Sequence, residues 1–142
     1  MSNVKITIGS TASEDSQGKF ETVAHGQLTE KNGTYYVRYD ETAETGMEGT
    51  KTLLKWTDDT LIIIRHGNYE HKQELRQGFV SHTMYTTPYF SVPLVAETRA
   101  LDISGKDNRW QFAAVYNVTL NEEPQGQITL DILIEEEEPR GN

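Results

Sequence analysis

The sequence contains no cysteine, which excludes disulfide bonds, a thiolate nucleophile and any cysteine-ligated zinc site. It has only 4 prolines, and its longest purely aliphatic run, Leu61–Ile64, is far too short to span a membrane. Positive charge is also scarce, because Lys and Arg number 13 against 22 acidic residues, for a formal net charge of −9. Nucleic-acid binding and attachment to anionic membranes both need a basic surface, so we expect neither partner.

The first ten residues lack a basic segment followed by an apolar one, so we expect no signal peptide and a cytoplasmic location. A chain of 142 residues is long enough to bury a core without covalent cross-links. We therefore expect a single domain over residues 1–142, with a solvated acidic tail from about residue 135, as a monomer or a homodimer. We expect no cofactor.

What the sequence does contain is typical of a β-sheet protein, including 7 tyrosines and seventeen threonines. Short runs of alternating apolar and polar residues are separated by turn residues such as Asn32-Gly33 and Asp58-Asp59. Further turns are expected at Ser104–Asn108 and Pro124–Gly126, and surface loops at Gly9–Lys19 and Thr42–Gly49. The predicted strands are Val4–Ile8, Phe20–Leu28, Thr34–Glu41, Thr50–Trp56, Thr60–Arg65, His71–Gln77, Phe79–Thr87, Phe90–Ile103, Trp110–Leu120 and Ile128–Ile134.

Two of these strands are informative for different reasons. The composition of His71–Gln77 also tolerates a helix, but Leu75 alone cannot supply an apolar helical face, so the context favours a strand. In Trp110–Leu120 the alternation is the clearest of the chain and predicts that Trp110, Phe112 and Tyr116 share one buried face.

About ten consecutive strands with short connections are compatible with a β-sandwich or an up-and-down barrel. Hairpins between neighbouring strands favour the barrel, because closure removes the exposed strand edges that promote aggregation. The sequence therefore predicts an all-β fold, a single closed antiparallel barrel with little or no helix. A barrel of this size leaves room for a small ligand in its interior.

Arg65 is the most informative candidate residue, because it follows the most apolar strand in phase with Leu61 and Ile63. A guanidinium inside a barrel would bind a carboxylate or phosphate through two parallel hydrogen bonds. The alternative is a structural salt bridge, for instance to Glu41 or Glu97, or simple exposure at the strand end. Tyr85, Thr87, Thr98 and Tyr116 would add hydroxyls that orient a ligand, or would only pack across strands.

Several short motifs in order, Tyr39-x-Glu41, Arg65-x-Gly67, Tyr85-x-Thr87, Thr98 and Tyr116, resemble the DUF1934 family, which is grouped with the calycins. The resemblance covers nearly the whole chain. It implies a calycin-like antiparallel β-barrel in a cytoplasmic bacterial protein of unassigned function. The sequence departs from the pattern at Phe90, where a glycine is expected. With this resemblance, Tyr39 and Glu41 join Arg65, Tyr85, Thr87, Thr98 and Tyr116 as hypothetical ligand-binding residues.

A metal site has weaker support. His66 and His71 flank a predicted hairpin loop and would meet across it with Glu70 nearby, but their spacing matches no known ligand signature.

Three function classes follow from these observations. The first is a barrel that binds a small, anionic or amphipathic ligand, with no catalytic residues. The second is an enzyme that uses Arg65 with Glu41 or a histidine as acid or base. The third is a protein-interaction module.

Overall fold

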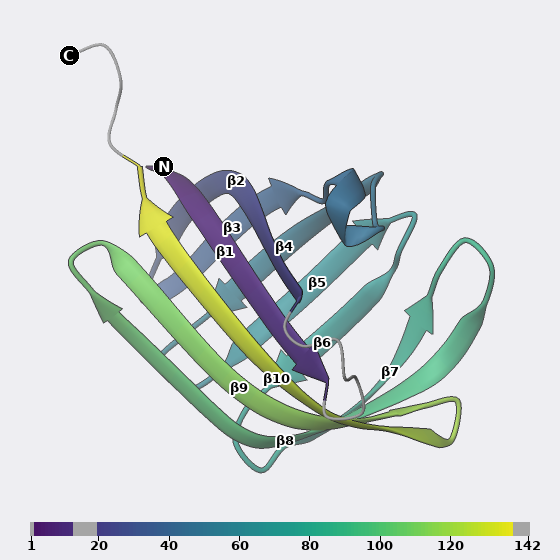
Figure 1. Cartoon of the computed structure of the whole chain (residues 1–142). Helices are drawn as coiled ribbons and strands as arrows, with labels where there is room; N and C mark the ends of the chain where they lie inside the picture. The colour runs from purple at the N-terminus through teal and green to yellow at the C-terminus, as the bar shows by residue number, and fades with distance from the viewer. Residues whose placement is uncertain (1, 13–19, 138–142) are drawn as a thin grey trace.

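The computed structural model describes residues 2–12 and 20–137, and within them the chain forms ten strands and one short 3-10 turn (Figure 1). The 3-10 turn spans Ala43–Thr45. The strands are β1 (Ser2–Ala12), β2 (Phe20–Lys31), β3 (Thr34–Asp40), β4 (Thr50–Trp56), β5 (Leu61–Gly67), β6 (His71–Leu75), β7 (Val80–Thr86), β8 (Ser91–Lys106), β9 (Arg109–Leu120) and β10 (Glu123–Glu136). In these residues no helix is long and apolar enough to cross a membrane.

The strands form one antiparallel sheet in the order β6-β5-β4-β3-β2-β1-β10-β9-β8-β7. Nearly every connection joins neighbouring strands, and a ladder between β1 and β10 joins the two halves of the chain. Figure 1 shows β1, β10, β9 and β8 running side by side in front of β3 to β6. The sheet thus curls into a nearly closed up-and-down barrel, which confirms the predicted fold class.

The two ends of the sheet, β6 and β7, meet at a seam without a continuous ladder. A single bridge joins Glu70 to Thr86, with the Glu70 N–H donating to the Thr86 carbonyl at 2.9 Å and the reverse bond at 3.0 Å. Just before β7, the Gly78 N–H donates to the Thr98 carbonyl at 3.0 Å, but this bond extends the β7–β8 pairing and does not cross the seam. Closure is therefore less complete than the sequence suggested.

Most predicted strands are present, and β4 has the predicted bounds. Strand β6 is also confirmed, because His71–Leu75 pairs with β5 along its length. The prediction for Gly9–Ala12 was wrong, since these residues extend β1 and pair with β10 up to Ala12 and Ile128. Their own side chains carry no apolar pattern, so the neighbouring strand imposes the extended conformation. The rest of the predicted loop, residues 13–19, lies outside the described residues.

The predicted turn at Pro124–Gly126 was also misplaced. The chain turns at Asn121 and Glu122, which have φ angles of 51° and 69°, and Pro124–Gly126 instead forms an irregularity inside β10. Asn favours such left-handed turn positions, but the more conspicuous proline and glycine concealed the signal. At the other end β10 continues to Glu136, so the first residues of the predicted tail belong to the sheet, and residues 138–142 lie outside the described residues.

Inside the barrel, cross-strand pairing stacks the inward-facing side chains in rows. At one end the rows are apolar, and their buried side chains are Val37, Leu54, Trp56, Leu61, Leu75, Phe112 and Ile134. Four rings close this end and form what we call the aromatic cluster: Tyr35, Trp56, Trp110 and Phe112. Toward the other end the same strands present polar side chains, and this part of the interior is the polar half of the barrel.

Candidate functional site

The polar half begins where strands β3 to β6 change from apolar to polar inward-facing residues. Tyr39 pairs with Thr52 across the β3–β4 ladder, Thr52 pairs with Arg65, and Arg65 pairs with His71. Because side chains alternate along a strand, each of these residues continues the face of the apolar core. A row of four polar side chains therefore crosses the wall of the barrel directly above the core.

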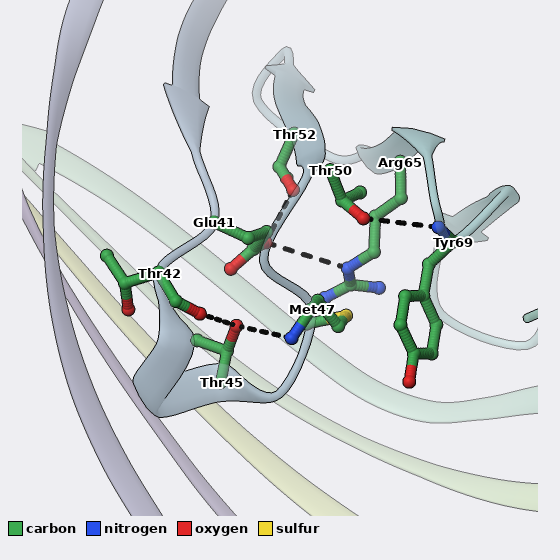
Figure 2. A network of polar contacts seen from close by, with 8 residues as sticks. All are labelled: Glu41, Thr42, Thr45, Met47, Thr50, Thr52, Arg65 and Tyr69. Atoms are coloured by element: carbon green, nitrogen blue, oxygen red, sulfur yellow. Dashed lines mark hydrogen bonds and ion pairs between the residues drawn. The ribbon is translucent and has the colours of Figure 1, made fainter. Parts of the chain in front are cut away.

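Arg65 and Glu41 form an ion pair inside this half. Arg65 Nε lies 3.8 Å from Glu41 Oε2, with the Glu41 side chain 3% and the Arg65 side chain 22% exposed. Thr52 Oγ1 donates to the same Glu41 oxygen at 2.5 Å, and the Glu41 N–H donates to the Thr50 carbonyl at 2.9 Å. Glu41 is thereby fixed from two directions, and Figure 2 shows that Nε is the guanidinium nitrogen that faces it.

This arrangement leaves Arg65 incompletely satisfied. Its Nε is buried without a hydrogen-bond partner in the described part of the chain, because 3.8 Å is too long for a hydrogen bond. The predicted salt-bridge partner Glu41 is present, whereas Glu97 contacts Arg99 at 3.3 Å. Arg65 is therefore charge-paired, but it retains donors for a further partner.

A cavity of about 190 Å³ adjoins the ion pair, and we call it the Arg65 cavity. The 3-10 turn and the following loop cover part of it, with Thr45 Oγ1 donating to the Thr42 carbonyl at 2.9 Å and accepting from the Met47 N–H at 3.2 Å (Figure 2). Its lining combines polar and apolar side chains: Ile8, Ser10, Phe20, Thr22, Tyr39, Glu41, Thr45, Met47, Arg65, Tyr116 and Leu130.

Two tyrosines of the cavity stay protonated at physiological pH. Burial raises the pKa of Tyr39, and the negative charge of Glu41 raises it further, which outweighs the opposing effect of Arg65. Burial likewise raises the pKa of Tyr116, and here the Arg65 charge opposes the shift. Both phenol groups are therefore neutral hydroxyls, and that of Tyr39 interacts with Glu41 and Thr52.

His71 faces the same interior from β6 and is 6% exposed. Burial lowers its pKa to about 4, and the nearby Arg65 charge adds to the shift. The imidazole is therefore neutral near pH 7. Its Nε2 lies 3.1 Å from Thr83 Oγ1, and its ring meets the Tyr85 ring edge-on with centroids 5.4 Å apart.

The structure brings four of the seven predicted ligand-binding residues to the Arg65 cavity, namely Tyr39, Glu41, Arg65 and Tyr116. Thr98 lies next to them as the cross-strand neighbour of Tyr116, is 1% exposed, and has a hydroxyl without a hydrogen-bond partner in the residues described.

The other two predicted residues lie at the β7–β8 hairpin. The Tyr85 ring packs between those of His71 and Phe90, the residue that replaces the expected glycine. Thr87 lies in the turn, where its hydroxyl accepts the N–H groups of Tyr89 and Phe90 at 3.1 and 3.2 Å. The fold thus uses Thr87 to shape the turn.

The weak metal candidates are divided between the two faces of the wall. His66 Nδ1 lies 2.7 Å from Glu70 Oε1 on the exposed outer side, whereas His71 faces the interior. Within residues 2–12 and 20–137, no group of three or more histidine or acidic side chains could hold a metal ion.

Sequence reasoning missed several polar residues of this half. Thr52 and Thr50 share the inward phase of Leu54 and Trp56, and Gln73 shares that of Leu75. Gln73 is buried, and its amide nitrogen has no hydrogen-bond partner among the described residues. The available signal was a polar residue spaced two positions from buried apolar residues of the same strand. The same signal identified Arg65.

Comparisons with known proteins agree with this fold. The structure resembles the crystal structure of the ywiB protein from Bacillus subtilis, with a TM-score of 0.83 and 15% sequence identity over 96% of this chain and 93% of that one. A comparison with curated proteins finds no match. The sequence matches a family described as "Domain of unknown function (DUF1934)" over residues 4–132, a range that includes the whole Arg65 cavity. The chain therefore belongs to the DUF1934 family.

Proposed function

We propose that this protein binds a small ligand in the polar half of its barrel, with Arg65 holding the anionic or polar head of that ligand. The observation that carries the proposal is the incompletely satisfied guanidinium of Arg65 beside the Arg65 cavity. Arg65 Nε faces Glu41 at a distance too long for a hydrogen bond, so this buried guanidinium can take a further acceptor through its terminal nitrogens.

The surroundings of Arg65 support this proposal. Glu41 is fixed by Thr52 and interacts with Arg65 through Nε, which leaves the two terminal nitrogens of the guanidinium for another acceptor. Two parallel hydrogen bonds from this edge match the geometry of a carboxylate. The neutral hydroxyls of Tyr39 and Tyr116 line the same cavity and add uncharged donors.

An enzyme is the second candidate, favoured by the buried His71 with a shifted pKa beside Arg65. A general base works best when its pKa is near the operating pH, and a pKa of about 4 makes His71 a weak base. Its Nε2 also contacts Thr83. These two features favour a structural role for His71 and binding as the function of the site.

The binding proposal is tested with acetate, the simplest carboxylate probe, in an NMR titration of the labelled protein. We expect the side-chain N–H signals of Arg65 to shift as acetate saturates the site. Arg65→Met should abolish the binding, whereas Arg38→Met, on the exposed outer face of β3, should leave it unchanged. Native mass spectrometry of freshly purified protein should in parallel show a bound small molecule.

Stability must be separated from binding in this test. Arg65→Met strands the buried Glu41 carboxylate, so the free energy of unfolding should fall by roughly 3–5 kcal/mol. The double variant Glu41→Gln with Arg65→Met removes both charges and should recover most of this loss while still failing to bind acetate. Unshifted Arg65 signals, together with a native mass equal to that of the bare chain, would contradict the proposed function.

A further inference from the structure

We infer that the ligand is a short hydroxylated carboxylate, such as a hydroxy acid or sugar acid, and that the barrel excludes long acyl chains. This inference rests on the proposed function and names the class of molecule that the Arg65 site accepts. It follows from three features of the barrel interior: the packing of the apolar half, the chemistry of the cavity wall, and the size of the cavity.

The apolar half of the barrel is filled by the protein itself. In the aromatic cluster, the Trp56 ring lies 5.1 Å from Phe112, 5.5 Å from Tyr35 and 6.0 Å from Trp110, measured between ring centroids. The aliphatic side chains packed around it, Leu54, Leu61, Leu75 and Ile134, are at most 1% exposed. An acyl chain that continued from Arg65 toward this end would have to displace a close-packed core, which costs several large side-chain contacts.

The wall of the Arg65 cavity is rich in hydroxyl groups. Ser10 and Thr22 line it from β1 and β2, which lie between the tyrosine-bearing strands β3 and β9 in the sheet. The carboxylate of Glu41 provides a hydrogen-bond acceptor in the same wall. A ligand with both a carboxylate and hydroxyls can use these groups together: its carboxylate accepts from Arg65, and its hydroxyls donate to Glu41 and accept from the phenols.

The Arg65 cavity is small. The cavity measures about 190 Å³ and is partly open to solvent. This volume is below the roughly 300–1,000 Å³ that is typical of sites for drug-sized ligands. The space beside Arg65 therefore matches the polar head of a compound of a few carbon atoms. The apolar contribution of Ile8, Leu130 and Met47 is limited to the short carbon skeleton of such a compound.

The inference is tested by calorimetric titration of the wild-type protein with four compounds: glycerate, butyrate, glycerol and dodecanoate. Glycerate and butyrate share a short carboxylate skeleton but differ in their hydroxyls, so we expect glycerate to bind at least about tenfold more tightly. Glycerol lacks the carboxylate and should bind more weakly than glycerate. Dodecanoate should bind no more tightly than butyrate, because the aromatic cluster blocks its chain.

Two matched variants identify the groups that recognise the hydroxyls. Tyr39→Phe and Tyr116→Phe should each reduce the preference for glycerate over butyrate by about threefold or more, the loss expected for one hydrogen bond. Tyr36→Phe removes a tyrosine hydroxyl on the outer face of β3, where Lys55 Nζ lies 5.7 Å from the ring centroid, and should leave the preference unchanged.

Each outcome distinguishes the inference from the proposed function. Tighter binding of dodecanoate than of butyrate, or equal binding of glycerate and butyrate, would overturn the inference and leave Arg65 as a carboxylate site. If glycerol binds as tightly as glycerate, the carboxylate does not contribute to binding, and the inferred ligand class is wrong. If acetate and all four compounds fail to bind, the proposed function fails together with the inference.

Discussion

At the residue scale, Arg65 shows how one cation is accommodated inside a mostly apolar barrel. Charge neutralisation comes from Glu41, which Thr52 holds in place, so the buried pair satisfies the main electrostatic requirement. Hydrogen bonding is not satisfied to the same degree, since Arg65 Nε has no hydrogen-bond partner among the residues described. This difference between charge pairing and hydrogen bonding is the basis of the proposed ligand site.

The inward phase of Arg65 was readable from the sequence, because Leu61 and Ile63 share it. The partner Glu41 was one of two acidic residues considered, and only the fold decided between them. Glu41 lies one residue beyond β3, where the β3–β4 loop returns the chain over the cavity. Thr87 has the same kind of hydroxyl as Thr98, yet it accepts a hydrogen bond from the Tyr89 N–H within the hairpin turn. Residue type alone cannot separate these two roles.

The pKa of His71 gives a prediction for the dependence of stability on pH. This pKa is 6.5 for an unperturbed histidine and about 4 in the folded protein, with burial and Arg65 as causes. Between these values the unfolded chain binds more protons, so the contribution of His71 to stability is complete above pH 6.5 and is lost as the pH falls toward 4. The expected loss is on the order of 3 kcal/mol.

The measurement is the free energy of unfolding from denaturant titrations across this pH range. His71→Gln retains a hydrogen-bonding side chain toward Thr83 but does not titrate, so its stability should depend less steeply on pH than that of the wild type. His82→Gln on the exposed side of β7 is the control and should follow the wild-type curve. Parallel curves for wild type and His71→Gln would show that His71 does not titrate with a lowered pKa.

At the element scale, β9 confirms how far alternation predicts a buried face. Phe112 is 3% exposed and packs in the core, and Trp110 and Tyr116 pack against that core from partly buried positions. The residues between them, such as Gln111 and Ala113, lie on the exposed face. Strand β6 was harder to predict, because His71, Gln73 and Leu75 form an inward face that is mostly polar.

Truncation of Phe112 tests the packing of this strand. Phe112→Ala removes the ring that meets Trp56 edge-on, so the free energy of unfolding should fall by roughly 3–5 kcal/mol. Gln111→Ala, one residue away on the exposed face, should change it by less than about 0.5 kcal/mol. Denaturant titrations measure both values, and similar small losses in the two variants would mean that the buried face is assigned incorrectly.

At the scale of the whole molecule, the seam between β6 and β7 is the discontinuity in the barrel wall. At the bridge, the backbone N–H groups of Glu70 and Thr86 point across the seam. Because N–H direction alternates along a strand, every second N–H group on each side also points into the gap. These are the N–H groups of Lys72 and Glu74 in β6 and of His82 and Met84 in β7. The contact between His71 and Thr83 spans the seam through side chains.

Hydrogen exchange should reveal this seam. Amides that point into it lack a ladder partner, so we expect Lys72, Glu74, His82 and Met84 to exchange faster than the amides of β9, which has ladders with β8 and β10. Residue-resolved NMR exchange at neutral pH measures the difference. Equal protection on β6, β7 and β9 would mean that the barrel closes with a continuous ladder in solution.

The sequence by itself determined the fold class, the number of strands and the inward phase of most side chains, because alternation and turn residues are local properties of the chain. The tertiary structure decided which polar residues meet. The Arg65 cavity draws its wall from β1, β2, β3, β5, β9 and β10 and from the β3–β4 loop, which are far apart in the sequence. Their convergence depends on the cross-strand register and on curling of the sheet, and neither is encoded in any single strand.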